Sequence, residues 1–73
     1  MIRKIDNLPR FLRRKKVEEM TGLPRSTIYD RVRKGTFPAP LDLGGGHIVA
    51  WLESDVIRWM EERIKASRSK GKV

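Results

Sequence analysis

The sequence predicts a small, mainly α-helical domain with one β-hairpin, arranged as a winged helix-turn-helix. Three observations predict this fold class. Two short helix-forming segments are separated by a turn that contains Gly22, the second segment ends at Gly35, and two strand-like runs bracket the glycines at 44–46. The 73 residues suffice for one hydrophobic core and are too few for two domains.

The first third of the chain contains a basic arm, a short strand and a helix. Residues 1–10 show no sustained hydrophobic period and end in a proline-containing breaker, so we predict a flexible arm there. A short strand is expected at 11–13. Residues 15–20 (KKVEEM) are strong helix formers that place Val17 and Met20 on one face. The domain proper is therefore expected to begin at residue 11.

A second helix is expected at 24–34. Gly22 suits the left-handed conformation that ends one helix and redirects the chain, and Pro24 is tolerated at the first position of the next helix. Ile28 and Val32 are four residues apart and share an inward face. Gly35 is the expected C-terminal cap.

The remaining segments are predicted to form the hairpin, a last helix and a tail. Strand-like runs at 41–43 and 48–51 bracket a glycine-rich tip. The last helix is expected to start within 53–55, where acidic and hydroxyl side chains suit a helix N-terminus. We expect the winged domain to end at residue 66, followed by a basic disordered tail at 67–73.

The composition excludes several classes of function. Without cysteine the chain has no disulfide, no thiolate zinc site and no cysteine nucleophile, and the single histidine, His47, lacks both further metal ligands and a nucleophile to activate. We therefore expect no enzyme activity, no metal and no cofactor. The sequence shows no membrane-length apolar run and no signal peptide, so no membrane association and a cytoplasmic location are expected.

The charge balance favours a polyanionic partner. Lys and Arg total 17 against 9 acidic residues, for a net charge of +8. If Ile28 and Val32 face inward, the opposite side of the helix at 24–34 is exposed and carries polar and charged residues: Arg25, Ser26, Tyr29, Asp30 and Arg33. This side is the predicted reading face for the major groove of double-stranded DNA.

Each residue type on this helix suggests a contact. Arg25 is suited to donate two hydrogen bonds to a guanine, a contact worth about 1–3 kcal/mol of discrimination. The hydroxyls of Ser26, Thr27 and Tyr29 suit phosphate oxygens. Three further cations are expected to anchor the helix on phosphates, namely Arg31, Arg33 and Lys34, with both basic tails as further candidates. The alternative is that these cations only complement the negative end of the helix dipole.

Two other features carry competing interpretations. Asp30 is repelled by phosphate, so it either accepts from a cytosine amino group or braces Arg33 or Lys34 on the next turn, and we favour the brace. The hairpin tip, with Gly45, Gly46 and His47, is a second candidate DNA contact, although glycines also suit any loose loop. Both tryptophans are interpreted as core residues.

The residue order from 11 to 64 resembles the AlpA family of small phage-type regulators. Three stretches carry the resemblance: TGLPRSTIY, KGTFPAP and AWLESDVIRWM. The resemblance implies a winged helix-turn-helix like those of the MerR family and of phage excisionases, with a recognition helix at 24–34 and a wing at 41–51. By position, this DNA-reading helix would include Arg25, Ser26, Thr27, Tyr29 and Arg33.

The wing departs from the family pattern. Where many relatives have a basic residue after a shorter glycine turn, this chain has Gly46 and His47. This difference implies a wing contact that is weaker or depends on pH.

The combined expectation is a sequence-specific DNA-binding regulator of a prophage or mobile element that acts at an integrase or excision locus. An excisionase-type recombination directionality factor is the alternative within this class, and self-association on DNA is compatible with both. Two other classes stay open. One is an interaction module that docks on an integrase or an RNA polymerase subunit through its last helix, and the other is a basic membrane-surface peptide.

Overall fold

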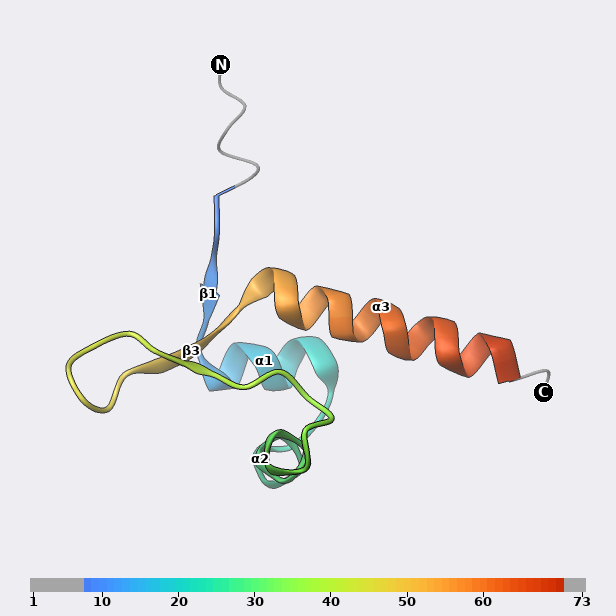
Figure 1. The fold of residues 1–73 in the computed structure, drawn as a ribbon, viewed down its shortest axis with the longest axis horizontal. Helices are drawn as coiled ribbons and strands as arrows, with labels where there is room; N and C mark the ends of the chain where they lie inside the picture. The colour runs from blue at the N-terminus through green and yellow to red at the C-terminus, as the bar shows by residue number, and fades with distance from the viewer. Residues whose placement is uncertain (1–7, 71–73) are drawn as a thin grey trace, which may run out of the picture.

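The computed structural model describes residues 8–70 as three helices and a small three-stranded sheet (Figure 1). In chain order these are β1 (Phe11–Leu12), α1 (Arg14–Thr21), α2 (Arg25–Lys34), β2 (Leu41–Asp42), β3 (Val49–Leu52) and α3 (Glu53–Lys70). The predicted class, mainly helical with a hairpin in a winged helix-turn-helix order, is confirmed.

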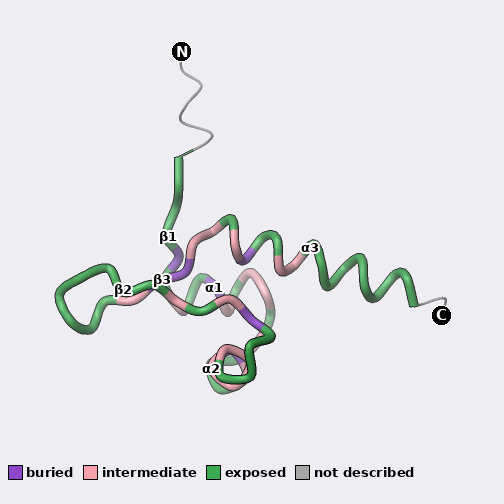
Figure 2. Tube along the Cα trace, in the orientation of Figure 1, coloured by how far each residue is buried: buried purple, intermediate pink, exposed green. Residues whose placement is uncertain are grey.

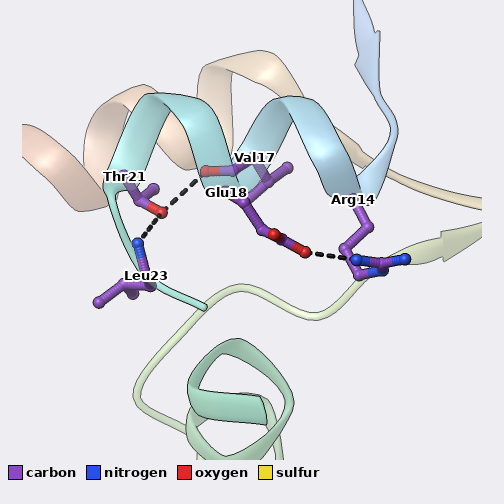
Figure 3. Close-up of polar contacts among 5 residues, drawn as sticks. All are labelled: Arg14, Val17, Glu18, Thr21 and Leu23. Atoms are coloured by element: carbon purple, nitrogen blue, oxygen red, sulfur yellow. Dashed lines mark hydrogen bonds and ion pairs between the residues drawn. The ribbon is translucent and has the colours of Figure 1, made fainter. Parts of the chain in front are cut away.

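The turn between α1 and α2 is closed by Gly22 and Thr21. Gly22 has a φ of 76° and its amide donates to the Glu18 carbonyl at 2.8 Å. The Thr21 hydroxyl donates to the Val17 carbonyl at 2.8 Å and accepts from the Leu23 amide at 3.2 Å (Figure 3). The last turn of α1 therefore fixes the direction in which α2 begins.

The second helix starts one residue later than the sequence predicts. Pro24 is the N-cap, with ψ 163° in the extended region, and its carbonyl accepts the first helical hydrogen bond from Ile28 at 3.0 Å. At its other end α2 stops at Gly35, which has a φ of 78° and donates to the Val32 carbonyl at 3.1 Å. The predicted glycine cap is confirmed.

The hairpin is one part of a three-stranded antiparallel sheet in the order β1-β3-β2. β2 pairs with β3 through Leu41 opposite Ala50, and β1 pairs with β3 through Leu12 opposite Trp51. The sequence predicts the strand at β1 but not this pairing. The Arg10 carbonyl continues the β1 attachment by accepting a hydrogen bond from the Glu53 amide at 2.8 Å.

The core lies where α1 and α2 meet the sheet and the start of α3 (Figure 2). Its cluster of buried side chains is Leu12, Val17, Ile28, Phe37, Trp51 and Val56. The indole N–H of Trp51 donates to the Pro38 carbonyl at 2.7 Å. Trp59 donates to the Thr36 carbonyl at 2.8 Å and packs edge-on against Phe37 at 4.8 Å between ring centroids. Both tryptophans are structural, as predicted.

The helix α3 is longer than expected. The sequence prediction ended the domain at residue 66 and left the following residues disordered, but α3 continues through Lys70. No glycine or proline occurs between residues 53 and 70, and the cations of the last turn complement the helix dipole. Residues 71–73 of the predicted tail lie outside the described part of the chain.

The predicted flexible arm also lies largely outside the described residues, which begin at Leu8. Leu8, Pro9 and Arg10 are exposed, and the Arg10 guanidinium lies 3.6 Å from the Glu53 carboxylate. The last residue of the expected arm is thus attached to the first turn of α3.

Candidate nucleic-acid interface

The outward side of α2 is the candidate interface. Its residues Arg25, Ser26, Tyr29, Asp30 and Arg33 line one shallow groove, as the helical spacing predicts. Arg25, Ser26, Arg33 and Lys34 are exposed, whereas Thr27, Tyr29, Asp30 and Arg31 are half-buried. Ile28 on the opposite side is fully buried. The predicted division of α2 into a core side and a polar side is therefore present.

Tyr29 does not lie fully on the exposed side, which corrects the prediction for this residue. Its ring lies 6.0 Å from the Trp51 ring, tilted by 57°, and packs against the core. Tyr29 is the residue after the buried Ile28, and it lies at the border between the core side and the polar side of α2. Its ring covers the edge of the core there. The Arg25 guanidinium lies 5.9 Å from the Tyr29 ring centre, a cation–π distance. Tyr29 thus links Arg25 to the core.

Asp30 braces the next turn of α2, as the favoured interpretation predicts. Its carboxylate accepts from Arg33 at 2.8 Å and lies 3.1 Å from the Lys34 ammonium. The hydrogen bond from Lys34, together with the positive charges of Lys34 and Arg33, holds the pKa of Asp30 below its ordinary value of 3.8. Two of the predicted phosphate anchors are therefore already paired within the free helix.

Both helices of the helix-turn-helix begin with cations. The first turns of α1 and α2 contain no acidic residue, and neither N-cap side chain forms a hydrogen bond. A cation at the positive end of a helix dipole costs roughly a few tenths of a kcal/mol, so the helix dipole does not favour Arg25 at this position. Exposed N–H groups and a cation at one helix start are instead suited to anions.

The cations divide into paired and unpaired sets. Within residues 8–70, six have an acidic partner within 4.0 Å: Arg10, Arg14, Lys16, Arg33, Lys34 and Arg58. In the same range eight have none: Arg13, Lys15, Arg25, Arg31, Arg63, Lys65, Arg68 and Lys70. The sequence prediction named Arg25 and Arg31 from this second set, placed Arg68 and Lys70 in a basic tail that it expected to be disordered, and did not single out the remaining four. The absence of acidic residues after Glu62 was the available signal for the α3 cations.

The wing is exposed but not basic. Residues 41–48 are all exposed, and the Asp42 carboxylate accepts a hydrogen bond from the Gly44 amide at 2.8 Å. Gly45 and Gly46 have φ values of 77° and 90°, which residues other than glycine rarely adopt. No Lys or Arg occurs from residue 35 to 57. The exposed wing side chains include three aliphatic ones: Leu41, Leu43 and Ile48.

The structure does not gather all predicted site residues into one patch. The hairpin tip with Gly45, Gly46 and His47 projects to one side of the molecule, and α2 lies at a different edge (Figure 1). The predicted site is therefore an α2 face with a separate wing that carries no lysine or arginine.

The sequence comparison identifies the family. Residues 10–64 match the family described as Prophage CP4-57 regulatory protein (AlpA). The chain belongs to the AlpA family. The match covers every element from β1 to the middle of α3, including the whole of α2 and the wing. This membership makes the protein a phage-type regulatory protein.

A curated relative comes from a phage. The chain is 53% identical over 62 residues to the "Uncharacterized protein ORF88" of Enterobacteria phage P4, and the alignment covers 85% of this chain and 68% of that protein. No solved structure matches this AlpA family member.

Within residues 8–70, no helix combines the length and the apolar character that a membrane span requires. In that same part of the chain, no three His, Cys, Asp or Glu side chains cluster as metal ligands would.

Proposed function

We propose that this AlpA family member is a cytoplasmic, non-enzymatic regulator that binds specific double-stranded DNA sites and controls transcription of a prophage or mobile element at an integrase or excision locus. The proposal is supported chiefly by Arg25. This side chain is exposed, has no acidic partner within residues 8–70 and stands at the first turn of the helix that follows the turn. That is the position from which a recognition helix reaches base edges.

In the proposed complex α2 enters the major groove. Arg25 donates to a guanine, with its guanidinium oriented by the Tyr29 ring. Ser26, Thr27 and the Tyr29 hydroxyl donate to phosphate oxygens and fix the register. Because Tyr29 also packs on Trp51, the core supports the residue that orients Arg25.

The last turn of α2 anchors the helix on phosphates. Arg31 is unpaired within the described residues, whereas Arg33 and Lys34 share Asp30. On the duplex, phosphate oxygens replace Asp30 as partners of these two cations, so Asp30 lowers affinity for any duplex alike. Asp30 thereby limits binding to non-specific DNA.

Two alternative functions are compatible with the same fold. An excisionase-type directionality factor would bind DNA with the same α2 surface, but unlike the proposed transcriptional regulator it would act by bending the DNA site. An interaction module would dock through α3, but Trp59 and Met60 pack against the core and leave Ile57 and Ile64 as the exposed apolar residues of that helix. The DNA-binding function is therefore the better supported.

The test starts from selection of binding sites among random duplexes. A selected duplex is then titrated with wild type, Arg25→Ala and Arg58→Ala, a control cation that lies on α3 and pairs with Asp55. We expect Arg25→Ala to weaken specific binding by roughly 10- to 100-fold and to relax preference at one base pair, with an unchanged circular dichroism spectrum. Arg58→Ala should retain the preference.

The salt dependence gives a second readout. If about six phosphates are neutralised, the logarithm of affinity falls with the logarithm of salt concentration at a slope near −5. A failure to select any site, or an affinity that hardly changes with salt, would overturn the proposed function. Bending of the selected duplex would favour the excisionase alternative.

A further inference from the structure

The second half of α3 extends beyond the core. Trp59 and Met60 are its last residues packed against the core cluster, and residues 61–70 are all exposed. Ten residues of α-helix span about 15 Å. Figure 1 shows this segment running out past α2 on the side opposite to the hairpin. No other described element covers it.

The extension carries a concentrated positive charge. Residues 63–70 contain four cations and no acidic residue: Arg63, Lys65, Arg68 and Lys70. All four belong to the set without an ion-pair partner within residues 8–70. The helix dipole accounts for the two in the last turn, Arg68 and Lys70, but its effect does not reach back to Arg63.

The four cations fall on two different sides of α3. Arg63 lines the groove that Trp59 forms with Gly35 and Thr36, directly after the end of α2. Arg58 and two carboxylates, Asp55 and Glu62, line the same groove, and Asp55 is the partner of Arg58. At about 100° per residue, Lys70 lies roughly 20° around the helix from Trp59. Arg63 and Lys70 therefore share the side of α3 that faces the end of α2.

Lys65 and Arg68 point elsewhere. They lie roughly 120° and 180° around the helix from Trp59. Both line a separate groove with Glu61, Ile64 and Ser69. The chain thus provides two pairs of cations on one helix, of which one pair is directed to the α2 side.

We propose that Arg63 and Lys70 form a phosphate clamp on the same DNA duplex that α2 reads, on the flank opposite to the wing. This inference rests on the proposed DNA-binding function and assigns it a second contact. Half a turn of DNA is about 17 Å, close to the length of the exposed extension, so a backbone next to the α2 groove lies within reach of the long side chains. The clamp adds affinity without reading sequence, because its partners are phosphates.

The decisive comparison uses two double variants, Arg63→Gln/Lys70→Gln and Lys65→Gln/Arg68→Gln. Each removes two charges from the same exposed stretch, so the effect of net charge is matched. The first should lower the salt slope by about 2 and weaken specific and non-specific binding alike, by about eightfold per contact at 0.1 M salt. The second should stay close to wild type. Circular dichroism should show equal helix content for both.

Duplex length provides an independent readout. A duplex that ends at the α2 site is compared with duplexes extended by half a turn on either flank. Extension on one flank should strengthen binding of wild type and of Lys65→Gln/Arg68→Gln, and should leave Arg63→Gln/Lys70→Gln unchanged. Equal losses in both double variants, or no loss in either, would overturn the clamp.

The clamp and the proposed function fail differently. If Arg25→Ala loses specific binding while Arg63→Gln/Lys70→Gln matches wild type, the clamp is wrong and DNA reading by α2 stands. If wild type binds no duplex, the proposed function itself is wrong.

Discussion

At the residue scale, Asp30 shows how one acidic side chain fits into a basic helix. Its carboxylate holds Arg33 and Lys34 in defined positions on the last turn of α2. Because the same two cations are candidate phosphate anchors, Asp30 pre-arranges them and also competes with DNA for them. Its ionisation is therefore linked to the stability of the free protein.

Asp30→Asn should change the pH dependence of stability. The folded-state pKa of Asp30 lies below the ordinary value of 3.8, mainly because Lys34 donates a hydrogen bond to the ionised form. Its contribution to the free energy of unfolding is fully present above that ordinary value and is lost as the pH falls through the folded-state pKa. The stability gap between wild type and Asp30→Asn should thus narrow below about pH 4. Urea unfolding at pH 7 and pH 3 measures it, and a gap that stays constant would contradict the brace.

Tyr29 should separate packing from DNA contact. Tyr29→Phe keeps the ring against Trp51 and loses the hydroxyl, so it should keep the unfolding free energy and weaken DNA binding. Tyr29→Ala should cost about 2 kcal/mol of stability, because the half-buried ring and its aromatic contact are lost. Chemical denaturation and duplex titration of both variants provide the measurements. Equal stability of the two would show that the ring does not support the core.

At the element scale, α2 and the wing differ in charge, and the difference predicts unequal roles. The segment from residue 35 to 57 carries no Lys or Arg, so His47 is the only wing side chain with a titratable positive form. The wing's exposed aliphatic residues do not attract phosphate.

Substitutions at His47 and Arg31 test this difference. His47→Ala should leave the salt slope close to that of wild type, because the wing contributes no lysine or arginine to phosphate contacts. Arg31→Ala should lower the slope by about 0.9, the value for one phosphate contact. The measurement is affinity for one duplex over a series of salt concentrations. If the wing instead contacts a phosphate through its backbone amides, shortening the hairpin should reduce affinity for the duplex, whereas His47→Ala should not.

Elements set by local signals were predictable from the sequence. Gly22 and Gly35 end α1 and α2 because the left-handed conformation favours glycine, and the three glycines at 44–46 mark the hairpin tip. The exposed polar side of α2 followed from the spacing of Ile28 and Val32 alone. Helical period and turn chemistry act over a few residues, so one sequence suffices to locate them.

Features that depend on distant residues were not predictable. The attachment of β1 to β3 and the contact of Tyr29 with Trp51 join residues 22 or more positions apart. The extension of α3 through Lys70 was missed because a polar, basic composition is common to exposed helices and to disordered tails. The ion pairs were not predictable either, because they depend on side-chain conformations that the spacing of residues in the sequence does not define.

At the scale of the whole molecule, stability depends on very few buried side chains. Seven hydrophobic residues of the described chain are buried, and Trp51 is the largest of them. A 73-residue chain has about 4–11 kcal/mol of unfolding free energy in total. One large core substitution therefore removes a substantial fraction of it.

Trp51→Phe should be far more damaging than its conservative chemistry suggests. It removes the indole N–H that donates to Pro38 and leaves space in the centre of the core, at a cost of about 2 kcal/mol or more. Trp59→Phe should cost less, because Trp59 is only half-buried. Thermal and urea unfolding followed by circular dichroism measure both. A smaller loss for Trp51→Phe than for Trp59→Phe would contradict the assigned core.

The placement of the two indoles also gives the protein its own optical reporters. Trp51 lies beneath Tyr29 at the edge of α2, and Trp59 stands at the point where the exposed part of α3 begins. In Trp59→Phe the remaining emission comes from the interior next to α2, whereas Trp59 reports on the root of the extension. Ultraviolet fluorescence of unlabelled wild type and Trp59→Phe, titrated in parallel, can therefore distinguish engagement by α2 from engagement by α3.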